Sequence, residues 1–353
     1  MSRFFIKKFD KLTPYTPGEQ PKVNNLIKLN TNESPFSPSK KGIKEAKKEL
    51  KRLNLYSDPD CTNLVNKLAK TYGVTNKEVI VTNGSDEVLN FAFMAYCDDK
   101  TPAAFADITY GFYKVFAKLH NIDYKLIPLK EDFSIDINDY KNINSTIFIA
   151  NPNAPTGLYL ELSKIEEILK NNPDNIVVID EAYVDFGNES AVNLIKKYDN
   201  LLVTGTFSKS RSMAGARLGF GIANENIIKD LNTLRFSTNP YNVNRMTLAA
   251  GFGVLCDEEY TKENIEKICE NREFLKEELK NLGFKMTDST ANFIFVKHDK
   301  INGEDLYNLL RERNILVRHF NIDRIKDYLR ITIGTKNEMK ILIKNLKEIL
   351  EDI

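Results

Sequence analysis

Short apolar runs alternate with longer amphipathic stretches through the first two thirds of the chain. Apolar runs of this kind, bounded by turn residues, predict buried β-strands. The runs predicted to be strands are EVIV at 78–81, AAFADITYG at 103–111, YKLIPL at 124–129, STIFIANPN at 145–153, NIVVIDEAY at 175–183, NLLVTGTFSK at 200–209 and RLGFGIA at 217–223. Several are apolar on both faces, which is typical of a mostly parallel sheet covered by helices. The pattern predicts an α/β fold with such a central sheet.

The pattern changes near residue 257. A charged amphipathic stretch at 258–284 predicts a long helix that ends at Gly283. Further strands are expected at 291–297, 315–320 and 328–334, and further helices at 303–314 and 336–350. The chain before residue 30 is rich in proline and polar residues and predicts an extended arm that packs with this second unit. We therefore expect a large domain over 30–250 and a smaller α+β domain from 1–29 and 251–353.

Composition narrows the possible partners. The chain has 353 residues, which suits two domains with real hydrophobic cores. With 50 basic and 49 acidic residues the formal net charge is +1, so there is no overall signal for binding nucleic acid. One local basic run, SKKGIKEAKKELKRL at 39–53, has no interleaved aromatic residues and is interpreted as a solvated helix.

Cysteine and histidine usage predicts neither disulfides nor a metal site. The 4 cysteines form no Cys-x-x-Cys pair, and the 3 histidines do not lie at metal-ligand spacing. No apolar run approaches the length of a membrane-spanning helix, and the N-terminal residues lack the long apolar core of a signal peptide. These features predict a cytoplasmic protein without a membrane partner.

Polar side chains follow several of the predicted strands. Ligands of open α/β sheets bind outside the carboxyl ends of the strands, so these side chains are expected to share one edge of the sheet. In TNGSDEVL, at 82–89, Gly84 leads into a helix whose first backbone N–H groups, from Ser85 and Asp86, could face a phosphate. An ordinary helix cap is the alternative for this stretch.

Asp180 and Tyr183 follow the apolar run at 175–179. A buried aspartate at the end of a strand is costly unless it has a cationic partner, and a protonated pyridinium nitrogen is one such partner. Tyr183 could donate a hydrogen bond to a phenolate oxygen on the same ring. The alternative for Asp180 alone is a carboxylate satisfied by backbone amides.

Lys209 lies in TFSKSRSMAGARLGF, at 206–220, among small and hydroxyl side chains. Burial and the nearby positive charge of Arg217 would favour its neutral, nucleophilic amine. Arg217 and the hydroxyl groups of Thr206 and Ser208 could hold a phosphate, although a polar loop between a strand and a helix is the plainer interpretation. Together with Asp180, these groups fit pyridoxal phosphate, a phosphorylated pyridine aldehyde.

With these residues in place, the chain resembles the histidinol-phosphate aminotransferases, within the fold-type-I enzymes that use pyridoxal phosphate. The resemblance covers nearly the whole chain in order. It rests on LTPYTPGEQP, LNTNESPFSPS, YSDPD, TNGSDE, TYGFY, NPNAPTG, DEAYVDF, TFSKSRSMAGARLGF and YLRITIGT. It implies a large domain with a mainly parallel sheet, a smaller α+β domain, and pyridoxal phosphate as the cofactor.

The resemblance also implies roles for individual residues. Lys209 matches the Schiff-base lysine and general base, Asp180 the partner of the ring nitrogen, and Tyr183 the partner of the ring oxygen. The residues that match the phosphate site are Gly84, Ser85, Asp86, Thr206, Ser208 and Arg217. Tyr110 matches the aromatic residue that stacks on the cofactor ring.

Further residues of the resemblance concern the partner subunit and the substrate. Tyr56 matches a tyrosine that reaches the cofactor phosphate of a neighbouring subunit, which implies a homodimer with shared active sites. Arg330 and Arg318 match arginines that bind the anionic groups of the substrates, and Tyr15 matches a tyrosine beside the substrate phosphate. Planar guanidinium groups suit both carboxylate and phosphate, although both arginines could instead form surface ion pairs.

The chain departs from the family pattern beside the cofactor. The asparagine that bonds the ring oxygen is replaced by Ala154, so the neighbouring Asn153 is a candidate for that role. On the substrate side, Ile108 stands where a proline is common, and the residues after Arg318 also differ.

The resemblance predicts transamination between L-histidinol phosphate and 2-oxoglutarate, giving imidazole acetol phosphate and L-glutamate in histidine biosynthesis. A decarboxylase similar to those acting on threonine phosphate and an aromatic amino acid aminotransferase remain as alternatives. A cofactor-binding regulator is a further alternative, but such proteins carry a DNA-binding extension for which the N-terminal arm is too short.

Overall fold

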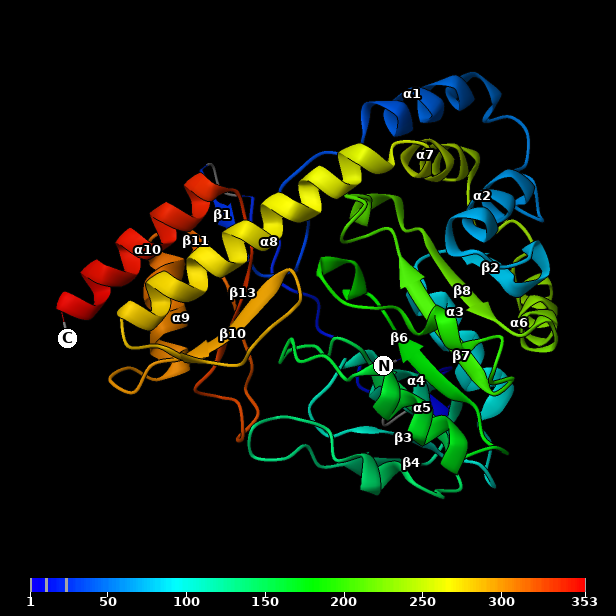
Figure 1. Ribbon diagram of the computed structural model, residues 1–353, viewed down its shortest axis with the longest axis horizontal. Coiled ribbons are helices and arrows are strands. Elements are labelled where there is room, and N and C mark those ends of the chain that lie inside the picture. Colours follow the sequence, from blue (N-terminus) through cyan, green and yellow to red (C-terminus); the bar gives the residue numbers. More distant parts are fainter. Residues whose placement is uncertain (1, 10–11, 23–24, 353) are drawn as a thin grey trace.

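The computed structural model describes residues 2–9, 12–22 and 25–352. Residues 1, 10, 11, 23 and 24 of the expected N-terminal arm, and residue 353, lie outside the described part. In Figure 1 the two larger sheets are each accompanied by helices, and the long helix α8 (Glu258–Asn281) runs from the smaller of them towards the larger.

The larger sheet has seven strands in the order β2-β8-β7-β6-β5-β3-β4. Their bounds are β2 (Val79–Thr82), β3 (Ala103–Ala106), β4 (Tyr124–Ile127), β5 (Thr146–Ala150), β6 (Val177–Asp180), β7 (Leu201–Thr206) and β8 (Gly219–Ala223). Only β8 is antiparallel to its neighbours, β2 and β7. The mainly parallel sheet and the α/β class predicted from the apolar runs are therefore confirmed.

The strands are apolar at successive positions because each face of the sheet packs against helices. Val177 and Ile179 of β6 belong to one core, and Val178 belongs to the core on the opposite face. The first core includes residues of α2 (Thr62–Tyr72), α5 (Leu162–Asn171) and α7 (Arg245–Leu255). The second includes residues of α3 (Ser85–Tyr96), α4 (Phe112–His120) and α6 (Glu225–Thr238). Successive side chains along a strand point to opposite faces of the sheet, so each strand contributes to the cores on both sides.

The smaller sheet has four strands in the order β12-β13-β10-β9. Its elements are β9 (Lys285–Met286), β10 (Phe293–Lys297), β12 (Arg318–His319) and β13 (Leu329–Thr332), with α8, α9 (Gly303–Glu312) and α10 (Lys336–Glu351) beside them. The end of the N-terminal arm contacts this unit, because β1 (Ile27–Lys28) pairs in parallel with β11 (Ile315–Leu316). Leu29 follows β1 and is buried in the same core.

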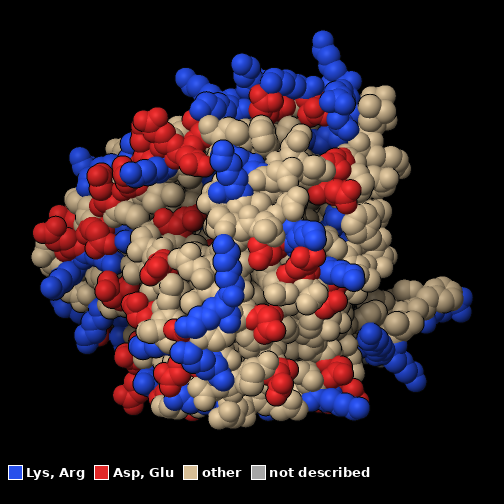
Figure 2. Space-filling view, turned by 45° about the vertical axis from the view of Figure 1, so that its right-hand side comes forward, with Lys and Arg blue, Asp and Glu red and all other residues tan. Residues whose placement is uncertain are grey.

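The basic run at 39–53 forms α1 (Lys40–Glu49), which packs against α7. Two of its basic side chains pair locally, Lys48 with Glu45 and Arg52 with Glu49. Figure 2 shows basic and acidic side chains interspersed over one face of the molecule, with basic ones gathered at its upper edge. The remaining elements are short 3₁₀ helices: η1 (Lys7–Phe9), η2 (Leu50–Arg52), η3 (Asn76–Glu78), η4 (Ile137–Tyr140), η5 (Val184–Phe186), η6 (Ala191–Leu194) and η7 (Ala214–Ala216).

None of the helices in the described part of the chain is both long enough and apolar enough to cross a membrane. The longest helix, α8, carries charged residues throughout and ends at Asn281, two residues before the predicted end at Gly283.

Candidate active site

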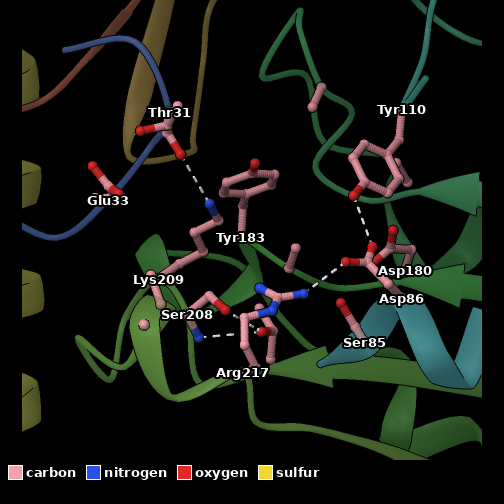
Figure 3. A pocket seen from close by; sticks show the side chains of 16 residues that line it. Thr31, Glu33, Ser85, Asp86, Tyr110, Asp180, Tyr183, Ser208, Lys209 and Arg217 are labelled. Carbon is pink, nitrogen blue, oxygen red and sulfur yellow. Dashed lines mark hydrogen bonds and ion pairs between the residues drawn. The ribbon is translucent and has the colours of Figure 1, made fainter. Parts of the chain in front are cut away.

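A cavity of about 310 Å³ opens at the carboxyl ends of β5, β6 and β7 (Figure 3). This is the edge at which the sequence predicted a ligand site. The expected site residues that line it are Ser85, Asp86, Tyr110, Asp180, Tyr183, Thr206, Ser208, Lys209 and Arg217. Residues from distant parts of the sequence thus meet around one space, whose size is in the range of small-molecule sites.

The N-terminus of α3 forms one end of the cavity. Gly84 caps the helix with φ of 80°, a conformation that favours glycine, and Ser85 and Asp86 begin its first turn. The backbone of Gly219 on β8 presses against this turn, since a Cβ built on Gly219 would lie 2.2 Å from the backbone nitrogen of Ser85. The close approach leaves helical N–H groups at the cavity edge, where they can bind an anion.

Arg217 brings positive charge to the same end. Its Nη2 donates to Asp86 Oδ2 at 2.8 Å, and the Tyr110 hydroxyl donates to Asp86 Oδ1 at 2.7 Å. Arg217 adopts a left-handed backbone conformation with φ of 53°, and Ser212 in the same loop has φ of 58°. Such strained backbone is found preferentially at ligand sites, where the surrounding structure enforces it.

Thr206 and Ser208 complete this end from the loop after β7. The Thr206 hydroxyl donates to Ser208 Oγ at 2.9 Å, and the Ser208 backbone N–H donates to Thr206 Oγ1 at 3.1 Å. Both side chains are buried. The hydroxyl groups, the helix N-terminus and the guanidinium together make a site that could hold a phosphate.

Asp180 ends β6 and lies at the floor of the cavity, with only 5% of its surface exposed. The Tyr113 hydroxyl donates to Oδ2 at 3.0 Å, and the Thr204 hydroxyl donates to Oδ1 at 3.2 Å. Burial nevertheless raises the pKa of Asp180 to about 6, because the hydrogen bonds offset the lost hydration only in part. A cationic ligand group placed here would favour the carboxylate form.

Lys209 extends into the cavity from the opposite side, and its Nζ donates to the carbonyl oxygen of Thr31 at 3.1 Å. Burial, followed by the nearby charge of Arg330, lowers the pKa of Lys209 to about 8. A larger fraction of this amine is therefore neutral near neutral pH than for a solvated lysine. Nζ lies 5.8 Å from the centre of the Tyr183 ring.

The loop that carries Lys209 is held by its next two residues. The Ser210 hydroxyl and Arg211 Nη1 both donate to Asp185, the arginine at 2.7 Å. Arg211 Nη2 also donates to the Tyr72 hydroxyl at 3.2 Å. Asp185 lies in η5, the short helix that begins directly after Tyr183. These bonds therefore fix the lysine loop relative to that tyrosine.

The structure does not bring Asn153 to the cavity lining. Its Oδ1 accepts from the Thr109 hydroxyl at 2.7 Å, and its Nδ2 donates to the Ile108 carbonyl oxygen and to Thr156 Oγ1, each at 3.0 Å. The Asn153 amide thus joins two loops, whereas the neighbouring Ala154 lines the cavity.

Arg318 and Arg330 are directly opposite one another on the antiparallel strands β12 and β13. Both guanidinium groups lie over the Phe320 ring, at 5.7 and 5.6 Å from its centre. Arg330 Nη2 donates to the Asn30 carbonyl oxygen at 3.0 Å, while its buried Nε has no hydrogen-bond partner among the described residues. Like charges opposite one another destabilise a strand pair, so this pair is suited to an anionic ligand.

The two remaining expected tyrosines lie outside the cavity lining. Tyr15 packs on Phe112, with ring centroids 4.5 Å apart, and its ring lies near Gly111. Tyr56 is 77% exposed and stacks on Tyr241, with ring centroids 4.4 Å apart.

Four residues at the site received no role in the sequence analysis. Tyr113 bonds Asp180, Thr31 bonds Lys209, and Glu33 lines the cavity. The fourth is Asn32, whose Nδ2 donates to the Tyr183 hydroxyl at 3.0 Å. Three of the four belong to the motif LNTNES, which supported the resemblance. The motif could therefore have been placed at the cavity from the sequence. No feature of the sequence marked Tyr113.

The donor set fits the cofactor expected from the sequence. One end of the cavity offers amide, hydroxyl and guanidinium groups for a phosphate. The floor offers a buried carboxylate that forms no ion pair among the described residues and suits a protonated ring nitrogen. The opposite wall offers an amine of lowered pKa. These are the three attachments that pyridoxal phosphate requires.

Comparisons with known proteins show the family and the fold. The family model described as aminotransferase class I and II matches residues 24–346. The histidinol-phosphate aminotransferase of Brachyspira hyodysenteriae is 50% identical over 356 residues and is covered, like this chain, to 100%. That of Clostridium acetobutylicum is 48% identical, with 99% of each chain covered. The structure of histidinol-phosphate aminotransferase from Sinorhizobium meliloti in complex with pyridoxal-5'-phosphate has a TM-score of 0.85 at 21% identity, covers 92% of this chain and 91% of that chain, and has the same fold.

Proposed function

This chain belongs to the class I and II aminotransferase family, and we propose that it transfers the amino group of L-histidinol phosphate to 2-oxoglutarate. It is a transaminase that depends on pyridoxal phosphate. The products are imidazole acetol phosphate and L-glutamate, and the reaction belongs to histidine biosynthesis. The full-length identity of 50% to a histidinol-phosphate aminotransferase supports this reaction.

The opposed arginines of β12 and β13 carry the substrate assignment. Arg318 and Arg330 face one another across the strand pair, so a doubly charged phosphate or a dicarboxylate would relieve their mutual repulsion. The two substrates present these groups in turn. We assign Arg330 to the distal anion or carboxylate of the substrates, and Arg318, in the same pocket, with Tyr15 to the substrate phosphate.

The cofactor is held at three points. The groups assigned to its phosphate are Ser85, Asp86, Thr206, Ser208 and Arg217, which line the cavity, and Gly84, which caps α3. Asp180 binds the ring nitrogen, Tyr183 donates to the ring oxygen, and Tyr110 stacks on the ring. When bound, pyridoxal phosphate supplies an electron sink for the charge that develops as the substrate loses its α-proton.

Lys209 is the covalent anchor of the cofactor and the base that moves the proton. Its amine is neutral in a substantial fraction near pH 8, because burial and Arg330 lower its pKa to about 8. In that form its Nζ would accept the α-proton of the substrate and hold it for return when the cofactor is bound. Asp180 sustains the reaction by keeping the ring nitrogen protonated, which its buried carboxylate favours once that cation is present.

We further infer a cytoplasmic homodimer in which Tyr56 completes the phosphate site of the partner subunit. The exposed stack of Tyr56 on Tyr241 supports this inference, since large aromatic side chains are enriched at protein interfaces. Within each subunit we propose a large domain over 30–250 and a small domain formed by 1–29 and 251–353.

The substrate assignment is tested by Arg318→Ala, with Arg311→Ala as the matched control. Arg311 is a surface residue on α9 whose guanidinium pairs with Glu19. Loss of a charged hydrogen bond should lower kcat/KM for L-histidinol phosphate by roughly 10- to 100-fold. The value for phenylalanine should change by less than about threefold, and Arg311→Ala should affect neither substrate. Equal losses for both substrates in Arg318→Ala would refute the phosphate assignment.

A further inference from the structure

Three consecutive residues, at 30–32, contact Arg330 and the two cavity residues Lys209 and Tyr183. Asn32 donates through Nδ2 to the Tyr183 hydroxyl oxygen at 3.0 Å. The two residues before it use their carbonyl oxygens, which accept from Arg330 Nη2 at 3.0 Å and from Lys209 Nζ at 3.1 Å. Asn32 alone makes its contact through a side chain, so only this contact depends on which residue occupies the position.

The hydrogen bonds around Asn32 fix the orientation of its amide. The residue is fully buried, and its backbone N–H donates to Thr332 Oγ1 at 2.9 Å. The Thr332 hydroxyl in turn donates its single proton to Asn32 Oδ1 at 3.0 Å. Since Oδ1 is occupied in this way, the donor end of the amide must face Tyr183.

This arrangement determines where the Tyr183 proton points. A tyrosine hydroxyl has one proton to donate, and Asn32 already occupies an acceptor position on its oxygen. Among the described residues no other group bonds that hydroxyl, and Tyr183 lines the cavity (Figure 3). The proton is therefore available to a ligand atom in the cavity.

Among the described residues that line the cavity, none carries a side-chain amide that could share this task. Ala154 lines the cavity with a methyl group and packs in the same small apolar cluster as Tyr183. Asn153 has its amide bonded to Thr109, Ile108 and Thr156. Tyr183 is thus the donor on this side of the cavity.

We propose that Asn32 is a positioning residue that aims the Tyr183 proton at the ring oxygen of pyridoxal phosphate, a role made necessary by the alanine at position 154. The inference rests on the proposed placement of the cofactor ring on Asp180. Asn32 also acts against the effect of burial on Tyr183, because its hydrogen bond lowers a pKa that burial raises. Its backbone φ of 55° lies in the left-handed region, which glycine and aspartate also adopt.

The test is Asn32→Gly, which keeps the left-handed backbone, adds no charge and removes the amide. The readout is the pH midpoint of the change in visible absorption of the bound cofactor. A hydrogen bond to the ionised ring oxygen favours that form, so weakening it should raise the midpoint by about half to one pH unit, a change in proton affinity of about three- to tenfold. Asn121→Gly is the matched control, because Asn121 is an exposed left-handed residue (φ of 59°) after α4, and it should leave the midpoint unchanged.

A double-mutant cycle separates this role from a merely structural one. Tyr183→Phe should itself raise the midpoint, and Asn32→Gly should add nothing in the Tyr183→Phe background. If Asn32→Gly does not fold, the isosteric Asn32→Asp replaces it. Its carboxylate would take the Tyr183 proton, so the rise in midpoint should be larger with Tyr183 present than in the Tyr183→Phe background.

An unmoved midpoint in Asn32→Gly, or an equal shift with and without the Tyr183 hydroxyl, would overturn the inference and leave the proposed function intact. If the unsubstituted chain showed no cofactor absorption after addition of pyridoxal phosphate, the proposed function would fail and the inference with it.

Discussion

Replacing Gly219 by alanine should displace the phosphate site without touching any polar group in it. A Cβ at this position would lie 2.2 Å from the backbone nitrogen of Ser85 and 2.3 Å from the carbonyl carbon of Gly84, where an ordinary contact begins at 3.4 Å. The obstacle is backbone rather than a flexible side chain, so the turn must move by about 1.2 Å. A displacement of this size disrupts hydrogen bonds from the turn to a charged phosphate, and each such bond is worth about 1.5–3 kcal/mol, or roughly 10- to 100-fold in affinity. We therefore expect the dissociation constant for pyridoxal phosphate to rise by roughly 10- to 100-fold.

The assay is titration of cofactor-free protein with pyridoxal phosphate, followed by absorption of the bound form. Gly221→Ala on the same strand is the matched control, because its Cβ would meet side chains rather than backbone, those of Ile80 and Val88 at 3.0 Å and of Leu202 at 3.5 Å. That overpacking should cost about 1–3 kcal/mol of stability. It should change cofactor affinity by less than about threefold. If Gly219→Ala bound the cofactor as tightly as Gly221→Ala, the assignment of the α3 turn to the phosphate would be wrong.

Two further predictions concern the buried carboxyl groups at the end of β6. Burial raises the pKa of Glu181 to about 8. Between about pH 5 and pH 8 the unfolded chain therefore releases a proton that the folded chain keeps. Because of this difference, the free energy of unfolding should fall by up to about 1.4 kcal/mol for each unit by which the pH rises. Glu181→Gln should remove this slope in urea unfolding, and an unchanged slope would contradict the raised pKa. Asp180→Asn should weaken pyridoxal phosphate binding by roughly tenfold or more, because it replaces a charge-assisted hydrogen bond by a neutral one. The same substitution should stabilise the cofactor-free protein near pH 8, because it removes a buried carboxylate. Equilibrium dialysis and thermal unfolding measure the two effects, and a parallel loss of both would argue against a cationic partner for Asp180.

The features predicted well from the sequence are those fixed by local chemistry. Most strands of the large sheet are apolar runs because both their faces are covered, whereas the edge strand β4 is partly exposed. β6 and β7 end in the polar residues Asp180 and Thr206, which line the cavity, and β5 ends in Ala150. Gly84 and the first residues of α3 are similarly local, since a glycine before a helix defines the turn. The single antiparallel interior strand, β8, could not be distinguished from its neighbours by composition.

The contacts that the sequence did not reveal join residues far apart in the chain. Tyr113 reaches Asp180 across 67 positions and Asn32 reaches Tyr183 across 151. Neither residue type is unusual in its local context, so only the packing of α4 and of the N-terminal segment against the sheet brings them to the site. Asn153 shows the opposite case. It is next in sequence to Ala154, which stands where the family has asparagine, but its amide bonds neighbouring loops and does not reach the cavity.

The central claim is tested most directly by the visible absorption of the holoenzyme during addition of one substrate at a time. L-histidinol phosphate alone should convert the absorption of the bound cofactor, and 2-oxoglutarate should then restore it, with release of L-glutamate. Absorption that is present but does not change with L-histidinol phosphate would contradict the proposed amino donor, and conversion accompanied by release of carbon dioxide would identify a decarboxylase instead.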